Sequence, residues 1–340
     1  MTNASESSIA VAIYTHPEYY PPLLNTIDEL AEMFSDIQVI TRNLKDNHWN
    51  YPGSVNFFLS GEFISIRDSE RKSIWWKMFS FLKFTQVFFK VLKRWKPKWV
   101  MCNDHITLFS FRLIRPFLGY TVRLWYHNHD VIEDGTIRKL SVGGIALKSE
   151  RKYFHRINLF TLPSRSRLSY FPLDKLKGDC IVIPNYPSIR RMTFDRSEWK
   201  NGMEFKILYQ GHIGEGHGLE KMIDFAKLDS SLKLTIIGPG EKEFIQFLKG
   251  KVAMLGIDEQ VLILNPVSYS ELSKITLDHH VGWAVYEPLN IAFRTAASAS
   301  NKIYEYAAAG LPIIYYKNEH YLKFLGGYTW AFPSDLSETD

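Results

Sequence analysis

Short apolar runs alternate with amphipathic stretches along the chain. In the first half, each apolar run is bounded by polar or turn-forming residues and has the length of a strand. The stretches between these runs repeat apolar positions at helical spacing. The expected strands are 9–14, 36–40, 55–59, 99–102, 122–126, 157–162 and 180–183, and the expected helices are 23–34, 69–93, 106–117 and 145–154. Short apolar strands separated by helices are typical of a parallel sheet that is covered on both faces.

The same alternation starts again after residue 204. The expected strands are 205–210, 232–237, 261–264, 281–285 and 312–316, and the expected helices are 218–228, 241–255, 269–276 and part of 298–312. The stretch 188–204 is polar and charged without clear periodicity, which is typical of a linker. A chain of 340 residues is also long for a single core. The sequence therefore predicts an α/β protein with two Rossmann-like domains, 1–187 and 205–340, facing each other across a cleft.

The composition of the chain also indicates its cellular compartment. The chain has the make-up of a soluble globular protein with a mild net charge of +5. Its two cysteines, Cys102 and Cys180, lie in apolar runs, so we expect buried free thiols and a reducing compartment. The apolar run 9–14 is too short for a signal sequence, and no run approaches transmembrane length. We therefore expect a cytoplasmic protein.

The stretch 298–312 joins a helix start to two charged side chains. Ser300 and Asn301 suit the start of a helix, whose free N–H groups and positive dipole end favour an anion such as a diphosphate. Lys302 falls in the first turn, where a cation is unfavourable unless an anion is usually present. Glu305 lies one helical step further on and could accept hydrogen bonds from ribose or sugar hydroxyls. The alternative is a capped amphipathic helix with a surface Lys and Glu.

A glycine-rich loop follows the first strand of the second half. Glycines occupy positions 211, 214, 216 and 218, and His212 and His217 lie between them. Such a loop lets the backbone approach a phosphate and offers N–H donors, to which the histidines could add. It matches neither the dinucleotide-binding pattern nor a P-loop. The alternative is a surface loop with two exposed histidines, but loops at this end of a strand are where α/β sheets bind ligands.

Three motifs in this order resemble the GT-B glycosyltransferases, especially the large family 4 group. They are the glycine loop, Gly238-Pro-Gly240 after the next strand, and the stretch from Ser300 to Pro312. Weaker landmarks in the first half are 103–105, 126–130 and 182–187. The resemblance implies a GT-B fold whose second domain binds a nucleoside diphosphate-sugar, most simply of UDP or GDP, as substrate. The implied donor-binding residues are Gly211, His212, Gly214, His217, Gly238, Tyr286, Ser300, Asn301, Lys302 and Glu305.

The resemblance assigns roles and also shows two departures. It implies that Glu305 binds the ribose and that the helix start at Ser300 holds the diphosphate. The family commonly has Arg and Lys in the glycine loop where this chain has His212 and His217. It also commonly has a second glutamate at the position of Ala297. The resemblance therefore supports donor binding more than the retaining mechanism usual in family 4, and the stereochemistry stays open.

Candidate catalytic groups come from strand ends of the first half. No Asp-x-Asp metal motif occurs, so we expect protein donors to stabilise the leaving diphosphate, without a metal or other cofactor. A base for the acceptor hydroxyl could be His16, His129 or Asp130, and His127 and Asp104 follow nearby strands. A histidine in a loop is otherwise most often structural.

The positive charge is concentrated between residues 71 and 103, where no acidic residue occurs. Cations there are interleaved with aromatic residues at mostly helical spacing, which suits a helix on an anionic membrane surface. The predicted membrane-facing residues are Lys72, Trp75, Trp76, Lys83, Lys90, Lys93 and Arg94. The alternative is a helix that packs its aromatic face on the sheet and solvates its basic face, and both can hold. No nucleic-acid motif accompanies the patch.

Together these patterns predict a cytoplasmic glycosyltransferase that is peripheral on the inner face of the cell membrane. It would move a sugar from the nucleotide donor to a glycan or lipid-linked acceptor, in bacterial surface polysaccharide biosynthesis. The alternatives are a nucleotide-sugar epimerase of the same fold and a catalytically degenerate scaffold that binds a partner. Little sequence follows 330–333, where the family usually has closing helices, so we expect a trimmed or short C-terminus.

Overall fold

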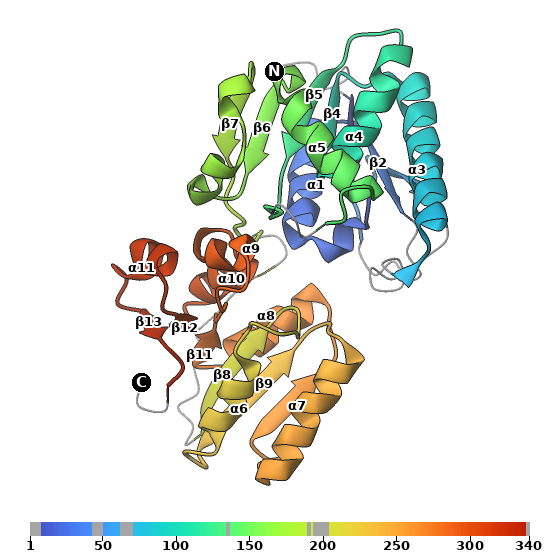
Figure 1. The fold of residues 1–340 in the computed structure, drawn as a ribbon. Helices are drawn as coiled ribbons and strands as arrows, with labels where there is room; N and C mark the ends of the chain where they lie inside the picture. Colours follow the sequence, from blue (N-terminus) through green and yellow to red (C-terminus); the bar gives the residue numbers. More distant parts are fainter. Residues whose placement is uncertain are drawn as a thin grey trace. The chain divides into compact units, whose positions relative to one another are not determined.

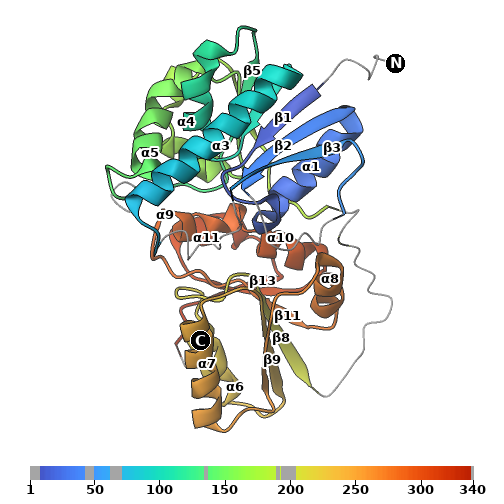
Figure 2. The same ribbon diagram turned by 90° about the vertical axis from the view of Figure 1, so that its right-hand side faces the viewer.

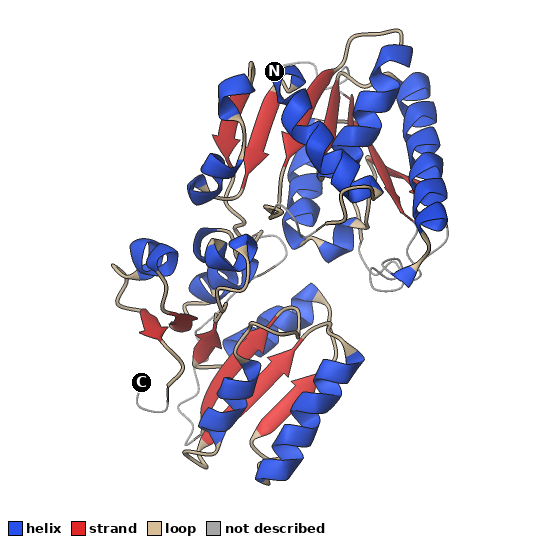
Figure 3. Cartoon of the chain, viewed as in Figure 1, coloured by secondary structure: helices blue, strands red, loops and turns tan. Residues whose placement is uncertain are grey.

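The computed structural model describes residues 8–42, 50–61, 71–133, 137–188, 192 and 204–337. The chain divides into two compact units, Met1–Pro184 and Asn185–Asp340. Each unit is a parallel sheet with helices packed against it (Figures 1 and 3). The expected linker, 188–204, lies almost entirely outside the described residues.

The first unit contains a seven-stranded parallel sheet in the order β3-β2-β1-β4-β5-β6-β7. Its strands are β1 (Ser8–Ala12), β2 (Asp36–Arg42), β3 (Val55–Ser60), β4 (Trp99–Cys102), β5 (Arg123–His127), β6 (Leu159–Leu162) and β7 (Asp179–Val182). Its α-helices are α1 (Pro21–Met33), α3 (Ile74–Trp95), α4 (His105–Ile114) and α5 (Val142–Tyr153). Side chains of α1 pack in the core on one face, and those of α3 and α4 pack in the core on the other. The expected two-faced parallel sheet is confirmed.

The second unit contains a six-stranded sheet in the order β10-β9-β8-β11-β12-β13. Its strands are β8 (Phe205–Gln210), β9 (Leu232–Ile237), β10 (Val261–Leu264), β11 (Val281–Trp283), β12 (Ile313–Tyr316) and β13 (Ala331–Ser334). Its α-helices are α6 (Leu219–Ala226), α7 (Lys242–Leu255), α8 (Tyr269–Leu277), α9 (Ile291–Arg294), α10 (Asn301–Ala308) and α11 (Glu319–Leu325). Here α6 and α7 share one core, whereas α10 and α11 share the core on the other face.

Three elements near the end of the chain were not expected from the sequence. These are α9, α11 and β13, which is an edge strand paired only with β12 among the described strands. Pro333 lies within β13, and proline is tolerated in an edge strand because its missing N–H faces away from the sheet. The short helix α11 is capped by Asn318, whose side chain accepts a hydrogen bond from Tyr321 N at 3.1 Å. These elements are too short to show a clear periodic pattern of apolar residues in the sequence.

One cysteine lies where the sequence predicted it and the other does not. Cys102 is buried in β4, but Cys180 is exposed on β7, so the expectation of two buried thiols is wrong for Cys180. The reason is the position of β7 at the edge of the sheet, which leaves its side chains with cover from one neighbouring strand only. An apolar run alone does not distinguish a central strand from an edge strand.

The long helix α3 divides its aromatic residues between two faces and runs along the outer side of the first unit (Figure 2). Phe84 and Phe88 are buried against the sheet, whereas Trp75 and Phe79 are each 66% exposed. Exposed basic residues begin near the middle of the helix with Lys83 and continue with Lys90, Lys93 and Arg94, and Lys72 is exposed just before the helix. No helix in the described ranges is long and apolar enough to cross a membrane.

Trp76 departs from the predicted membrane-facing set. It is only partly exposed, and the guanidinium of Arg42 lies 5.3 Å from the centre of its ring. The same guanidinium lies 5.2 Å from the ring of Tyr14, so Arg42 is held between two aromatic faces. Trp76 therefore packs against Arg42 at the end of β2, and the exposed apolar surface of α3 comes from Trp75 and Phe79.

Candidate functional site

Two glycine loops pack backbone against backbone at the carboxyl edge of the second sheet. Gly211 follows β8 and has a φ of +128°, and its N–H donates to Ile237 O at 3.0 Å. Gly238 follows β9 and has a φ of +147°. A Cβ atom on Gly238 would lie 1.9 Å from Gly211 O. Only glycine fits this crossing, which is why both strands end in glycine.

We expect Gly238→Ala to destabilise the protein by about 3 kcal/mol or more, because it combines backbone overlap with a φ that favours glycine. Gly250→Ala is the matched control, since a Cβ there would meet nothing within 4 Å and position 250 lies inside α7. The control should leave stability unchanged or raise it by up to about 1 kcal/mol. Urea unfolding measures both. Equal stability of the two variants would contradict the predicted crossing.

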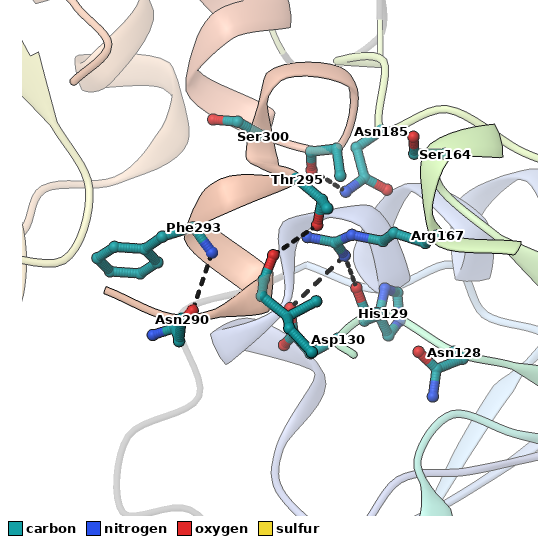
Figure 4. A network of polar contacts seen from close by, with 12 residues as sticks. Asn128, His129, Asp130, Ser164, Arg167, Asn185, Asn290, Phe293, Thr295 and Ser300 are labelled. Atoms are coloured by element: carbon teal, nitrogen blue, oxygen red, sulfur yellow. Dashed lines mark hydrogen bonds and ion pairs between the residues drawn. The ribbon is translucent and has the colours of Figure 1, made fainter. Parts of the chain in front are cut away.

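The start of α10 is fixed firmly against the end of β8. Tyr306 OH donates to Leu208 O at 2.9 Å and accepts from Gln210 N at 3.0 Å. Gly282 makes room for this ring, because a Cβ there would lie 2.4 Å from Tyr306 Cδ2. Just before the helix, Asn185 Nδ2 donates to Ala299 O at 2.7 Å (Figure 4). The first turn of α10 therefore has a defined position at the carboxyl edge of the sheet.

Ser300 precedes this turn but does not cap it. Its side chain makes no capping hydrogen bond, and its Oγ instead lies 2.7 Å from Tyr286 OH. Asn301, the first helical residue, is partly exposed. The predicted helix start is confirmed, and the side chain of Ser300 does not cap it because Tyr286 engages the hydroxyl. N–H groups without a side-chain cap at a helix start are suited to an anion.

Lys302 is buried in this first turn rather than exposed. It is 6% exposed, and its Nζ has no hydrogen-bond partner among the residues that the structure describes. The ammonium instead lies 4.0 Å from the ring centre of Tyr209 and 4.6 Å from that of Tyr286. Its stem runs past Gly211, where a Cβ atom would lie 3.4 Å from Nζ. Burial lowers the pKa of Lys302 to about 7, an effect that the nearby Glu305 opposes.

The two histidines of the glycine loop lie in different surroundings. His212 is exposed, whereas His217 is 5% exposed and packs 5.1 Å from Tyr286 and 5.0 Å from Phe293, between ring centres. Burial, followed by the Lys302 ammonium, lowers the pKa of His217 to about 2, so its ring is neutral. Its Nδ1 has no partner within the described ranges. Two buried nitrogen atoms, His217 Nδ1 and Lys302 Nζ, thus have no hydrogen-bond partner among the described residues, and both lie beside Tyr286.

Glu305 is buried at the centre of a directed hydrogen-bond network. It accepts from Gln210 Nε2 with one oxygen and from Tyr269 OH at 2.6 Å with the other. Gln210 Oε1 lies 2.9 Å from Thr276 Oγ1, whose one hydrogen is shared with Leu272 O at 2.7 Å. The Gln210 amide turns its NH2 group toward Glu305 because a carboxylate only accepts. Burial raises the pKa of Glu305, while the hydrogen bonds from Tyr269 and Gln210 and the charge of Lys302 lower it. A carboxylate held in this way keeps lone pairs for further donors.

In the first unit, the predicted histidines follow their strands but are buried. His16 caps the short helix η2 (Pro17–Tyr19), where its Nδ1 accepts from Glu18 N at 3.3 Å. His127 Nδ1 lies 2.6 Å from Thr161 Oγ1. Burial lowers the pKa of His16 to about 4 and that of His129 to about 3. These rings are neutral at pH 7 and weak as proton acceptors.

Asp130 is the exposed member of the predicted catalytic set. Its side chain is 62% exposed, and its Oδ1 lies 4.0 Å from Arg167 Nη1. The same Arg167 nitrogen donates to the backbone oxygen of His129 (Figure 4). Arg167, 4% exposed on the 3-10 helix η5 (Arg165–Tyr170), therefore fixes the loop after β5. Asp104 instead caps α4, where its Oδ1 accepts from Thr107 N at 2.7 Å.

Several residues of these sites could not be identified from the sequence. Tyr209 and Gln210 form the last part of β8, where their pattern indicates only a buried strand. Tyr269 shows only as the first residue of a capped helix. Arg167 lies in a polar turn without periodicity. Their contacts join positions far apart in the chain, so the useful signal was indirect: an aromatic or amide residue directly before a glycine loop at a strand end.

Comparisons with known proteins agree with this geometry. No protein-family model and no curated protein sequence matches the chain. Among solved structures, a sucrose-phosphate synthase from Thermosynechococcus elongatus is similar with a TM-score of 0.69 and 14% identity, over 96% of this chain and 86% of that one.

Two further solved structures are similar over most of the chain. Anabaena HepE in complex with UDP-glucose has a TM-score of 0.61 and 11% identity, over 96% of this chain and 85% of that one. The lipopolysaccharide outer core galactosyltransferase WaaB has a TM-score of 0.55 and 14% identity, over 91% and 80%. Both parallel sheets and these similarities confirm the prediction: the chain has the GT-B fold of glycosyltransferases.

Proposed function

We propose that the chain is a glycosyltransferase whose second unit binds a nucleoside diphosphate-sugar. The observation that carries the proposal is the buried ammonium of Lys302 beside two glycine loops, which has no hydrogen-bond partner in the described part of the chain. A buried cation without an anionic partner is costly, and proteins retain such groups mainly where a ligand supplies the counter-charge. A diphosphate at the start of α10 would supply it.

The arrangement suits stabilisation of a departing nucleoside diphosphate. Negative charge develops on that group as its bond to the sugar breaks, and fixed donors that face this charge lower the barrier. Lys302 can leave the rings of Tyr209 and Tyr286 because its stem is flexible, at the loss of about 2 kcal/mol of cation–π attraction. The chemistry proposed here uses protein donors in place of a metal ion.

We propose UDP as the nucleotide and Glu305 as its ribose-binding group. HepE, which is similar in fold, was solved with UDP and with UDP-glucose. Glu305 keeps free lone pairs beside the hydrogen bonds from Gln210 and Tyr269, so a ribose diol can donate to it. Hexosyl transfer is the simplest reaction for such a donor.

For the acceptor hydroxyl we propose Asp130 as the proton acceptor where the reaction inverts. Its carboxylate is the exposed one of the three predicted candidates. His16 and His129 are 3% and 8% exposed, so Asp130 is the accessible basic group of the three.

We further propose that the protein works in the cytoplasm on the inner face of the cell membrane, on a glycan or lipid-linked acceptor. The support is the exposed apolar first half of α3, with Trp75 and Phe79, followed by its exposed basic second half. WaaB, a galactosyltransferase of the lipopolysaccharide outer core, makes a surface polysaccharide a reasonable product class. Flotation with anionic liposomes tests this location.

UDP binding should be accompanied by proton uptake, which tests the site and its electrostatics together. The free Lys302 has a pKa of about 7, and a bound diphosphate raises it. At pH 8 the free amine is mostly neutral and the bound one charged, so uptake approaches one proton, and it declines toward zero below pH 6. Above pH 7 affinity should fall up to tenfold per pH unit. Calorimetry at pH 8 in two buffers of different ionisation enthalpy measures the uptake; UDP binding without uptake would contradict this role of Lys302.

Catalysis separates the transferase from its alternatives. A scaffold without activity is favoured by one observation: Ala297, at the position of the family's second glutamate, is buried in the core. Purified protein should slowly hydrolyse UDP-glucose or UDP-galactose, or transfer the sugar to added glycan. UDP binding without hydrolysis or transfer, for any donor and acceptor tried, would support the scaffold. Conversion between the two donors without an acceptor would support an epimerase.

A further inference from the structure

The loop after β5 carries polar atoms that the proposed donor site does not use. Asn128 Oδ1 and His129 Nε2 have no hydrogen-bond partner among the described residues. The two residues are 6% and 8% exposed, so their polar atoms lie away from solvent. A buried polar atom without a partner costs about 1–3 kcal/mol. Two of them on adjacent residues therefore indicate a missing partner molecule.

A chain of hydrogen bonds through Tyr126 to Glu150 fixes the direction of the Asn128 amide. Tyr126 OH donates to the buried carboxylate of Glu150 on α5, and its oxygen accepts from Asn128 Nδ2 at 2.9 Å. Burial raises the pKa of Glu150 to about 7, so at pH 8 it is mostly a carboxylate and takes the single hydrogen of the Tyr126 hydroxyl. Asn128 must then turn its NH2 group toward Tyr126. The amide oxygen of Asn128 consequently faces away from this chain of bonds as an acceptor.

The backbone of the same loop is also held in place. Asn128 N donates to Thr161 O at 2.9 Å, and the backbone oxygen of His129 accepts from Arg167. The ring of His129 stacks on Tyr20 with 5.5 Å between ring centres. The loop lies at the carboxyl edge of a parallel sheet, where such sheets bind ligands. Asn128 and His129 are thus held in position before any ligand arrives.

The chemistry of the two atoms selects a hydroxyl group. Asn128 Oδ1 only accepts hydrogen bonds, and the neutral His129 ring offers one lone pair or one N–H. A hydroxyl both donates and accepts, so it satisfies either arrangement. A fully ionised phosphate or carboxylate has no hydrogen for Asn128 Oδ1, and the neighbouring residue Asp130 carries a negative charge. The nearby cation, Arg167, already faces Asp130 at 4.0 Å and donates to the loop backbone.

We propose that Asn128 and His129 bind a hydroxyl of a neutral sugar on the acceptor, and that Tyr126 and Glu150 are positioning residues that aim the Asn128 amide. This inference rests on the proposed transferase function and names the acceptor class. The acceptor ends in an uncharged sugar at the point of contact, whatever carries that sugar.

The experiment measures binding of methyl glycosides of glucose, galactose and N-acetylglucosamine by saturation-transfer NMR at pH 8, with glucose 6-phosphate as the charged probe. Wild-type protein should bind at least one neutral glycoside more tightly than the charged sugar. Asn128→Leu should weaken that binding about tenfold, and Tyr126→Phe about threefold, because the amide is then free to turn over. Tyr120→Phe is the matched control, since it removes a buried, unpartnered hydroxyl before β5.

UDP affinity, measured in the same samples, should be unchanged in all three variants. If wild-type protein does not bind UDP, the proposed function is wrong. If it does bind UDP, the glycoside measurements test the acceptor site alone. Three outcomes would overturn the inference: no neutral glycoside bound at millimolar concentration, equal binding by Asn128→Leu, or tighter binding of glucose 6-phosphate. Should Asn128→Leu not fold, Tyr126→Phe against Tyr120→Phe gives the same comparison. If a buried water occupies this place and no sugar binds there, Asn128→Leu should bind glycosides as well as wild-type protein does.

Discussion

Lys302→Met should make the free protein more stable and nearly abolish UDP binding. The pKa of Lys302 is lowered from 10.5 to about 7, so burial disfavours its ammonium relative to the unfolded chain. Between these two values the unfolded chain binds more protons, and stability therefore rises with pH across that window. At pH 7 almost the full penalty applies. Methionine keeps the apolar stem without the charge, and we expect a gain of about 2 kcal/mol after the lost cation–π contacts are subtracted.

The gain should shrink toward zero at pH 10, where the wild-type amine is mostly neutral in the folded state. Urea unfolding at pH 7 and pH 10 measures this, and calorimetry measures the affinity for UDP, which we expect to fall at least a hundredfold. Lys274→Met is the matched control because Lys274 is exposed on α8. It should change neither quantity. Unaltered UDP binding by Lys302→Met, or lower stability at pH 7, would remove Lys302 from the proposed site.

Such opposite effects on stability and binding are the mark of a residue kept for a ligand. The sequence already indicated this residue, because a lysine in the first turn of a helix conflicts with the helix dipole. The motif from 298 to 312 is local, and its capping residues, charges and glycine lie within a few turns of one another. The motif and the alternation of strands and helices could both be predicted because each depends on residues that are close together in the sequence.

Contacts between distant parts of the chain could not be predicted. The sequence does not show that Tyr209 and Tyr286 enclose the Lys302 ammonium, nor that Tyr126 and Glu150 direct an asparagine. Burial of Lys302 itself was missed, since a lysine at a helix start normally reaches solvent. The same limit explains Cys180 and Trp76, whose exposure depends on which strand lies at the edge and which side chain lies beside the helix. Periodicity says which face is apolar, and the packing partners decide what covers it.

Glu305→Gln should remove the preference for ribose over 2′-deoxyribose in the nucleotide. The Glu305 carboxylate accepts from Gln210 and from Tyr269, and each oxygen keeps a lone pair for a ribose hydroxyl. An amide in its place has one accepting oxygen, and the NH2 group of Gln210 occupies that oxygen while Gln210 Oε1 stays beside Thr276 Oγ1. The new NH2 group then faces Tyr269, whose hydroxyl can rotate to accept from it. The cost in stability should stay within about 2 kcal/mol, while the acceptor for the second ribose hydroxyl is lost.

The informative quantity is the ratio of affinities for UDP and 2′-deoxy-UDP. Any effect of the variant on Lys302 and the diphosphate is common to both ligands and cancels in the ratio. Wild-type protein should prefer UDP by about tenfold to a hundredfold, since deoxyribose leaves a buried acceptor unpaired. Glu305→Gln should bind the two within about threefold of each other. Tyr269→Phe keeps the carboxylate and should keep the preference. A variant that retains the full wild-type ratio would mean that Glu305 holds α8, α10 and β8 together and does not contact the ribose.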